Sequence, residues 1–236
     1  MTDQDLPKRA VPLWKILLWS ALGLVLASIL LVLPWRWLPP PTTAFMLIHQ
    51  WQTEQDPLHG WVYWDDINPY LVIAVVAAED QKFPTHYGFD FEAIKSALKE
   101  RRNRTRGAST ISQQVAKNLF LWNGRSFVRK GIEAYIALLL ELLLSKERIL
   151  DLYLNLAEWG PNAFGAEAAA RLHFNKSAAT LTRDEAARLA AILPAPRRWS
   201  PKGSIATRRA ATILVRMQYA APKTEAPAPA KKRRRA

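Results

Sequence analysis

The chain has 236 residues, of which half are hydrophobic and 22% are charged, a balance that allows a buried core and excludes wholesale disorder. Lysine and arginine number 33 against 20 aspartates and glutamates. The resulting formal net charge of +13 favours anionic partners such as nucleic acid, phosphorylated substrates or lipid headgroups. The absence of cysteine excludes thiolate zinc sites, iron–sulfur clusters, disulfides and cysteine nucleophiles.

An apolar segment near the N-terminus predicts a single transmembrane helix at residues 13–33. The run from Ile16 to Leu33 is interrupted only by two serines and one glycine. At about 1.5 Å per residue, this segment spans the roughly 30 Å hydrocarbon core of a bilayer. Basic residues cluster before the run, and Arg36 alone follows it closely, so the positive-inside rule predicts that residues 1–12 are cytoplasmic and the rest is outside.

The remainder of the chain divides into a spacer, a helical domain and a tail. Residues 34–59 form a juxtamembrane segment with a stiff run of prolines, and residues 221–236 form a basic tail that cannot build a core and is expected to be disordered. Residues 60–220 show apolar spacings of three and four and no alternating strand pattern, so we predict one all-α domain. The predicted helices open at Asn68-Pro69 and otherwise cover residues 90–101, 109–119, 126–144, 146–155, 165–172, 182–192 and 205–218.

The first candidate for chemistry is Glu79. It shares a helix face with Val72, Val75 and Val76 at helical spacings. Burial of a carboxylate on an apolar face raises its pKa, which suits a general base or acid near neutral pH. A glutamate at a helix end that turns to solvent is the ordinary alternative, but Asp80, Phe83 and His86 follow within one short segment and favour a functional site.

A second candidate is the polar stripe within residues 107–118, where Ser109 is predicted to cap a helix. Its polar residues recur at three- and four-residue spacings and are Thr110, Gln113, Gln114 and Lys117, followed by Asn118. Such a stripe is usually a solvated helix face, but amides and a cation also suit sugar hydroxyls and a phosphate. Before it, the basic stretch from Lys95 to Arg106 is predicted to be an exposed loop.

The third candidate combines Arg129, Lys130 and Glu133, which are three and four residues apart on one predicted helix. Ordinary helical salt bridges explain this spacing. Two cations that hold a diphosphate, with the carboxylate orienting them, explain it equally well. The four histidines show no metal-ligand spacing, so no protein metal site is predicted.

Taken in order, these segments resemble the motifs of the peptidoglycan glycosyltransferases, specifically their monofunctional transglycosylases. Residues 79–88 are similar to the family pattern Glu-Asp-x-x-Phe-x-x-His-x-Gly, residues 107–118 resemble the second motif, and 129–133 the third. Residues 146–160 resemble the fourth motif, with Asp151 where glutamate is common, and 165–174 the fifth. Five ordered motifs over residues 60–205 are more specific than any single signature.

The resemblance implies a lysozyme-like helical fold and the polymerisation of lipid II into glycan strands, with release of undecaprenyl diphosphate and inversion at the anomeric carbon. Glu79 would be the catalytic base, and Glu133 a second catalytic or positioning carboxylate. Lys117, Arg129 and Lys130 would stabilise the departing diphosphate. The remaining substrate-binding residues would be Asp80, Phe83, His86, Thr110, Gln113, Gln114 and Asn118.

The same resemblance implies partners and a location. We expect lipid II, the growing glycan strand and the membrane as partners, with other cell wall synthases or division proteins as further candidates, and no nucleic acid. The predicted location is the bacterial inner membrane, with the catalytic domain periplasmic. No cofactor is expected to be required, although Mg²⁺ or another divalent cation could accompany the diphosphate. The alternative hypotheses are a lysozyme-like hydrolase or lytic transglycosylase, and a non-catalytic membrane scaffold.

Overall fold

The computed structural model of the protein describes residues 12–99, 109–124 and 126–220. Most of the basic stretch between Lys95 and Arg106 lies outside these residues, as do residues 1–11 and the tail 221–236. The first part of the predicted loop, from Lys95 to Lys99, is instead the end of helix α4 (Phe91–Lys99), within the helix predicted at residues 90–101. The rest of the loop, the cytoplasmic N-terminus and the disordered tail stay predictions.

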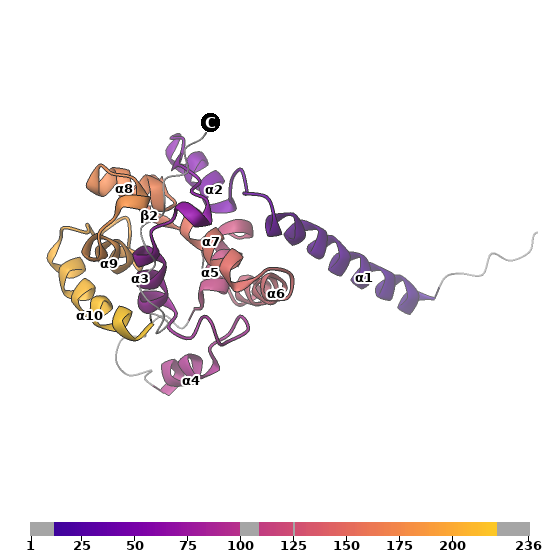
Figure 1. The fold of residues 1–236 in the computed structure, drawn as a ribbon. Helices are drawn as coiled ribbons and strands as arrows, with labels where there is room; N and C mark the ends of the chain where they lie inside the picture. Colours follow the sequence, from indigo (N-terminus) through magenta and orange to yellow (C-terminus); the bar gives the residue numbers. More distant parts are fainter. Residues whose placement is uncertain (1–11, 100–108, 125, 221–236) are drawn as a thin grey trace, which may run out of the picture.

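An apolar helix stands apart from the rest of the molecule. Helix α1 (Leu13–Val32) projects from the domain as a single rod and continues into the 3-10 turn η1 (Leu33–Arg36) (Figure 1). The segment Leu13–Arg36 has a mean hydropathy of 2.7 and is long and apolar enough to cross a membrane. The predicted N-terminal helix is therefore present, with the length and composition that a membrane span needs.

The rest of the described chain is mostly helical, as predicted. Helix α3 lies against α9 and α10 on one side of the domain, while α5 lies against α2, α6 and α7 on the other (Figure 1). These elements are α2 (Ala44–Thr53), α3 (Pro69–Glu79), α4 (Phe91–Lys99), α5 (Ile111–Phe120), α6 (Phe127–Leu143), α7 (Lys146–Leu156), α8 (Ala166–Phe174), α9 (Arg183–Ile192) and α10 (Ser204–Ala220), with the 3-10 turns η2 (Trp64–Asp66) and η3 (Ala178–Thr180).

Side-chain caps explain where several helices begin. Asn68 Oδ1 accepts a hydrogen bond from the Tyr70 amide at 2.9 Å, and Pro69 occupies the first position of α3, as the sequence predicts. Helix α5 differs from the prediction, because Thr110 rather than Ser109 is its N-cap. Thr110 has Gln113 three residues later and completes a reciprocal capping box, which the preceding serine cannot form in that register.

Two features of the fold were not predicted. Helix α2 occupies part of the juxtamembrane segment, capped by Thr43 and packed against α5. A small sheet joins β1 (Leu58–His59), β3 (Ala163–Phe164) and β2 (Glu158–Gly160) in that order, β1 parallel and β2 antiparallel to β3. Its strands have two or three residues each, too few to show an alternating pattern in the sequence.

Helix α1 is attached to the domain by specific contacts. The Ser28 hydroxyl of α1 lies 2.7 Å from the Tyr135 hydroxyl of α6. The Arg148 guanidinium of α7 donates to the backbone carbonyls of Trp35 and Leu38 at 2.8 and 2.6 Å. These bonds fix the segment that follows α1 against the start of α7, so α1 and the domain are joined at a defined place.

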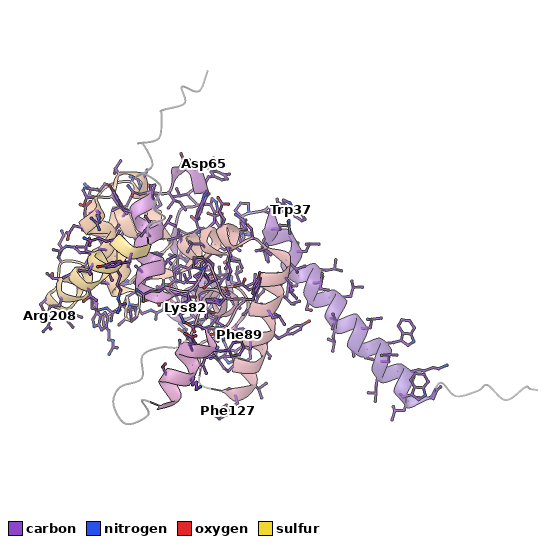
Figure 2. The ribbon with its side chains drawn as sticks, turned by 60° about the horizontal axis from the view of Figure 1, so that its bottom comes forward. Trp37, Asp65, Lys82, Phe89, Phe127 and Arg208 are labelled. Atoms are coloured by element: carbon purple, nitrogen blue, oxygen red, sulfur yellow. The ribbon has the colours of Figure 1, made fainter. Side chains whose placement is uncertain are left out.

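Helix α6 exposes an apolar face beside the anchor helix. The exposed apolar side chains of this outer face are Phe127, Val128, Ile132, Tyr135, Leu138 and Leu142. Figure 2 shows Phe127 at the end of α6 away from α1 and Trp37 where the anchor meets the domain. Phe127 is 98% exposed, which is costly for a side chain that faces water.

Candidate active site

The centre of the site is Glu79, the last residue of α3. Its carboxylate is half-buried, and its Oε2 accepts a hydrogen bond from Gln114 Nε2 of α5 at 3.0 Å. Burial raises the pKa of Glu79, while the Gln114 bond and the nearby charges of Arg209 and Lys117 act in the opposite direction. The structure therefore places the predicted carboxylate where burial favours its protonated form, the direction that a general base requires.

Gln114 is itself held by Tyr153 of α7. The Tyr153 phenol donates to Gln114 Oε1 at 3.2 Å, and only 1% of this tyrosine is exposed. Burial and the charges of Glu79 and Asp80 raise the pKa of Tyr153 well above its ordinary value, so the phenol keeps its proton. Three helices thus meet at one chain of hydrogen bonds that ends on the Glu79 carboxylate.

The next predicted residues, Asp80, Phe83 and His86, tie the loop after α3 to the start of α5. Asp80 is 6% exposed and accepts from His86 Nε2 at 2.9 Å and from the Ile111 amide at 3.0 Å. The rings of Phe83 and His86 pack edge to face with centroids 6.0 Å apart. The Asp80 carboxylate therefore compensates the positive N-terminal end of α5 and fixes Glu79 relative to that helix.

Thr110 and Gln113 are close to the site but are engaged by the fold. They are 3% and 4% exposed and form the capping box of α5, and Thr110 Oγ1 also donates to the Gly88 carbonyl at 2.7 Å. In this arrangement the hydroxyl and the amide oxygen serve the helix terminus. Their proposed contacts with substrate remain predictions.

The third predicted cluster is a buried carboxylate between two cations. Glu133 is 2% exposed, and its Oε2 lies 2.6 Å from Arg129 Nη1 while its Oε1 pairs with Lys130 Nζ. Arg129 Nε also donates to the Gly124 carbonyl at 2.9 Å, and Lys130 Nζ donates to the Ser109 hydroxyl at 3.1 Å. Arg129 and Lys130 also line an open cavity of about 250 Å³ with Ser126 and Phe127.

Lys117 links the two carboxylates electrostatically. It lies one turn beyond Gln114 on α5, and both Glu79 and Glu133 are close enough to act on its charge. Burial lowers the pKa of Lys117, while Glu133 raises it and the neighbouring cations lower it. Among the residues that the structure describes, Lys117 Nζ has no hydrogen-bond partner, and it lies 5.2 Å from the centre of the Phe45 ring of α2.

Asn118, the last predicted residue of this stripe, is 8% exposed and follows Lys117 on α5. Helix α5 therefore carries Gln114 towards Glu79 and Lys117 between Glu79 and the Glu133 cluster. The structure brings Glu79, Gln114, Lys117, Arg129, Lys130 and Glu133 to one region. Asp80, Phe83, His86, Thr110 and Gln113 surround this region and support α5.

Sequence reasoning missed three groups near the site. Phe45 lies in the juxtamembrane segment, where the Thr43 cap followed by an apolar periodicity was the available signal. Tyr153 lies in the fourth motif, but its contact with Gln114 depends on how α5 and α7 pack. Glu141 is a further buried carboxylate that accepts from Ser112 at 2.5 Å and from Lys146 at 2.7 Å.

No group of three histidine, aspartate or glutamate side chains that could hold a metal ion occurs in residues 12–99, 109–124 and 126–220. Both oxygens of Glu133 face cations, which further disfavours a metal at that carboxylate. The site therefore has the character of an anion-binding cluster beside a carboxylate of raised pKa.

Comparison with known proteins places this geometry in a family. The family model described as transglycosylase matches residues 46–218, well over half of the chain. The chain is 52% identical over 204 residues to a biosynthetic peptidoglycan transglycosylase of Pseudomonas entomophila (strain L48), which covers 82% of this chain and 85% of the relative. It is 53% identical over 215 residues to a protein of the same name from Ectopseudomonas mendocina (strain ymp), with 87% of each chain covered.

The match includes the segments that carry Glu79, Lys117 and the Arg129–Glu133 cluster. It also includes most of α2, which the sequence analysis assigned to the juxtamembrane segment. The resemblance inferred from the five motifs is confirmed, and the chain belongs to the transglycosylase family.

Proposed function

We propose that this chain is a membrane-anchored peptidoglycan glycosyltransferase that polymerises lipid II into glycan strands. The observation that carries the proposal is the pairing of a half-buried carboxylate, Glu79, with the cations of Lys117, Arg129 and Lys130 in one region. The names of the relatives support the same activity.

In the proposed reaction, Glu79 accepts the proton of the acceptor sugar's 4-hydroxyl. The hydroxyl oxygen attacks the anomeric carbon of the donor, and the bond from that carbon to the phosphate oxygen breaks with its electron pair on the diphosphate. Attack from the opposite face inverts the anomeric centre. A diphosphate is a good leaving group, so the reaction needs a base and cations rather than a strong general acid.

The cations would stabilise the charge that grows on the diphosphate. Lys117 is the best placed for this role, since the described residues give its ammonium no hydrogen-bond acceptor and burial removes part of its hydration. Arg129 and Lys130 line the open cavity, and Glu133 holds their side chains in place. Glu133 is thereby assigned a positioning role, with no proton transfer required of it.

The proposed location is the outer face of the bacterial inner membrane, with residues 1–12 cytoplasmic and the domain periplasmic. The C-terminal part of the apolar α1 contacts α6 through Ser28 and Tyr135, and α6 exposes an apolar outer face, which would place the domain against the bilayer surface. Among the apolar residues between the second and third motifs, Leu119 and Leu121 are buried, whereas Trp122 and Phe127 are exposed and could enter lipid. Other cell wall synthases or division proteins remain predicted partners.

Mg²⁺ is not assigned a protein site. The described residues supply no cluster of metal ligands, and the Glu133 oxygens are paired with cations. A divalent cation would therefore associate with the diphosphate of the substrate and not with the protein.

The test is polymerisation of lipid II by the purified full-length protein, compared with Glu79→Gln and with Glu92→Gln. Glu92 lies on α4 with its side chain 80% exposed, so the same chemical change there leaves activity at the wild-type level. Wild type should form long glycan and Glu79→Gln should form none. Polymerisation by Glu79→Gln would show that Glu79 is not the base. Release of muropeptides from finished peptidoglycan would favour the hydrolase alternative.

A further inference from the structure

We propose that Tyr153 is a positioning residue, whose phenol holds the Gln114 side-chain amide in the orientation that aims its NH₂ group at the Glu79 carboxylate. The inference extends the proposed function, because it concerns how the base of that reaction is kept ionised. It rests on two hydrogen bonds, from Tyr153 to Gln114 Oε1 at 3.2 Å and from Gln114 Nε2 to Glu79 Oε2 at 3.0 Å.

The orientation of the Gln114 amide decides which form of Glu79 it favours. With the NH₂ group towards Glu79, the amide donates to the carboxylate and stabilises the ionised base. With the amide reversed, its carbonyl would face Glu79, which repels the carboxylate and accepts a hydrogen bond from the protonated acid. The two orientations therefore act in opposite directions on the proton affinity of Glu79.

The phenol distinguishes the two orientations through its own hydrogen. Tyr153 is 1% exposed, and among the described residues its hydroxyl makes a hydrogen bond only with Gln114 Oε1. If the amide reversed, the phenol could accept from the NH₂ group, but its own hydrogen would be buried without a partner. The high pKa of Tyr153 keeps that hydrogen in place throughout the working range of pH, so the preference is permanent.

The other charged groups near Glu79 cannot select the orientation. Asp80 follows the last residue of α3, Lys117 comes from α5 and Arg209 from α10. Each acts on Glu79 through its charge, and among the described residues none of them makes a hydrogen bond to the Gln114 amide. Helix α9 also packs against α3 but contributes none of the groups that act on Glu79 among the described residues. The Tyr153 phenol is therefore the group that fixes the Gln114 amide, and its position depends on the packing of α7 against α5.

The consequence is a specific pH signature. Replacement of Tyr153 by phenylalanine keeps the buried ring and removes the constraint on the amide. We expect the acidic limb of kcat/KM in lipid II polymerisation to move to higher pH by roughly half a unit or more. On the acidic side of that limb activity should fall by about threefold or more relative to wild type, and it should recover to the wild-type level at alkaline pH, where Glu79 is ionised in both proteins.

A matched control is Tyr70→Phe. Tyr70 is the second residue of the same helix as Glu79, and its side chain is exposed to solvent. Its removal should leave the acidic limb unchanged. The double variant Tyr153→Phe/Gln114→Ala should behave as Gln114→Ala alone, since Tyr153 acts through Gln114.

A second measurement tests the inference without the polymerisation reaction. Full-length protein carrying ¹³C-carboxyl glutamate is titrated by NMR in detergent micelles, and Glu79 is assigned by the signal lost in Glu79→Gln. The midpoint of Glu79 should be higher in Tyr153→Phe than in wild type and unchanged in Tyr70→Phe. Equal midpoints in wild type and Tyr153→Phe would overturn the inference, whereas failure of the wild type to polymerise lipid II would overturn only the proposed function.

Discussion

Replacement of Glu133 by glutamine tests whether the third motif is a charge-compensated cluster. The carboxylate is 2% exposed and joins Arg129, whose side chain is 10% exposed, to Lys130, whose side chain is 44% exposed. Glutamine keeps the size of the side chain but leaves two cations beside Lys117 without their counter-charge. We expect the protein to lose both stability and polymerisation activity.

The size of the stability loss follows from burial. Removing one partner of a buried ion pair costs about 3–5 kcal/mol, because the other charge stays buried without compensation. The Arg129 contact is buried and belongs in this range, whereas solvent screens the Lys130 contact, so we expect about 3 kcal/mol. For a domain of this size, that loss lowers the Tm by roughly 6–12 °C.

The assay is thermal unfolding of the full-length protein in detergent, followed by circular dichroism at neutral pH. Pyrophosphate should raise the Tm of Glu133→Gln more than that of wild type, because the anion supplies the missing negative charge. Glu92→Gln, in the exposed pair with Lys82, should leave the Tm unchanged. A Tm for Glu133→Gln within about 2 °C of wild type would show that the cluster is not a compensated buried site.

Three further predictions concern the base, the central cation and a glycine. Burial raises the pKa of Glu79, so this group lowers stability as the pH rises from its unfolded-state pKa through its higher folded-state pKa. Glu79→Gln should therefore raise the Tm at about pH 8 but not at about pH 3, where the acid is protonated in both folded and unfolded states. The pKa of Lys117 is lowered by burial, so activity should decline with rising pH as this ammonium loses its proton. In Lys117→Arg the alkaline limb of any remaining activity should move to higher pH, because the guanidinium keeps its charge. An unmoved limb would assign the decline to another group. Gly165 has φ +86°, and a Cβ there would lie 2.6 Å from the Asn155 carbonyl oxygen. Gly165→Ala should therefore lower the free energy of unfolding, measured with denaturant, by more than about 2 kcal/mol. Gly131→Ala on α6, where no atom lies within 4 Å of the added Cβ, should not destabilise the protein.

Local signals in the sequence were sufficient for much of the helical fold. The structure confirms the helix start predicted at Asn68 with Pro69 and the helix predicted at residues 182–192, where Thr182 is the N-cap and forms a capping box with Glu185. Caps and apolar periodicity act over three or four residues, so they can be recognised without knowledge of the fold. The same local logic failed by one residue at α5, where Ser109 and Thr110 are both good caps and only Thr110 has a glutamine at the third helical position.

In the candidate site, too, the sequence identified some residues, and others depended on the packing of the helices. The sequence singled out Glu79, Lys117, Arg129, Lys130 and Glu133, because their residue types and spacings suit a base and an anion-binding cluster. It did not distinguish Gln114, which donates to Glu79, from Gln113, which caps its own helix. One position along a helix turns a side chain by about 100°, and which direction faces the site depends on neighbouring helices.

By itself, the sequence determined a membrane-length helix, a helical domain and the residue types of a family site, because composition, hydrophobic periodicity and motif order are properties of the linear chain. Tertiary structure alone decided that Glu133 is enclosed by two cations, that Phe45 lies beside Lys117, and that Tyr153 reaches Gln114. It also decided that residues 58–59 and 163–164 form a sheet. These contacts join different helices or strands, or successive turns of one helix. Their strength depends on how deeply the groups are buried, and burial is set by the packing of the whole domain rather than by neighbours in sequence.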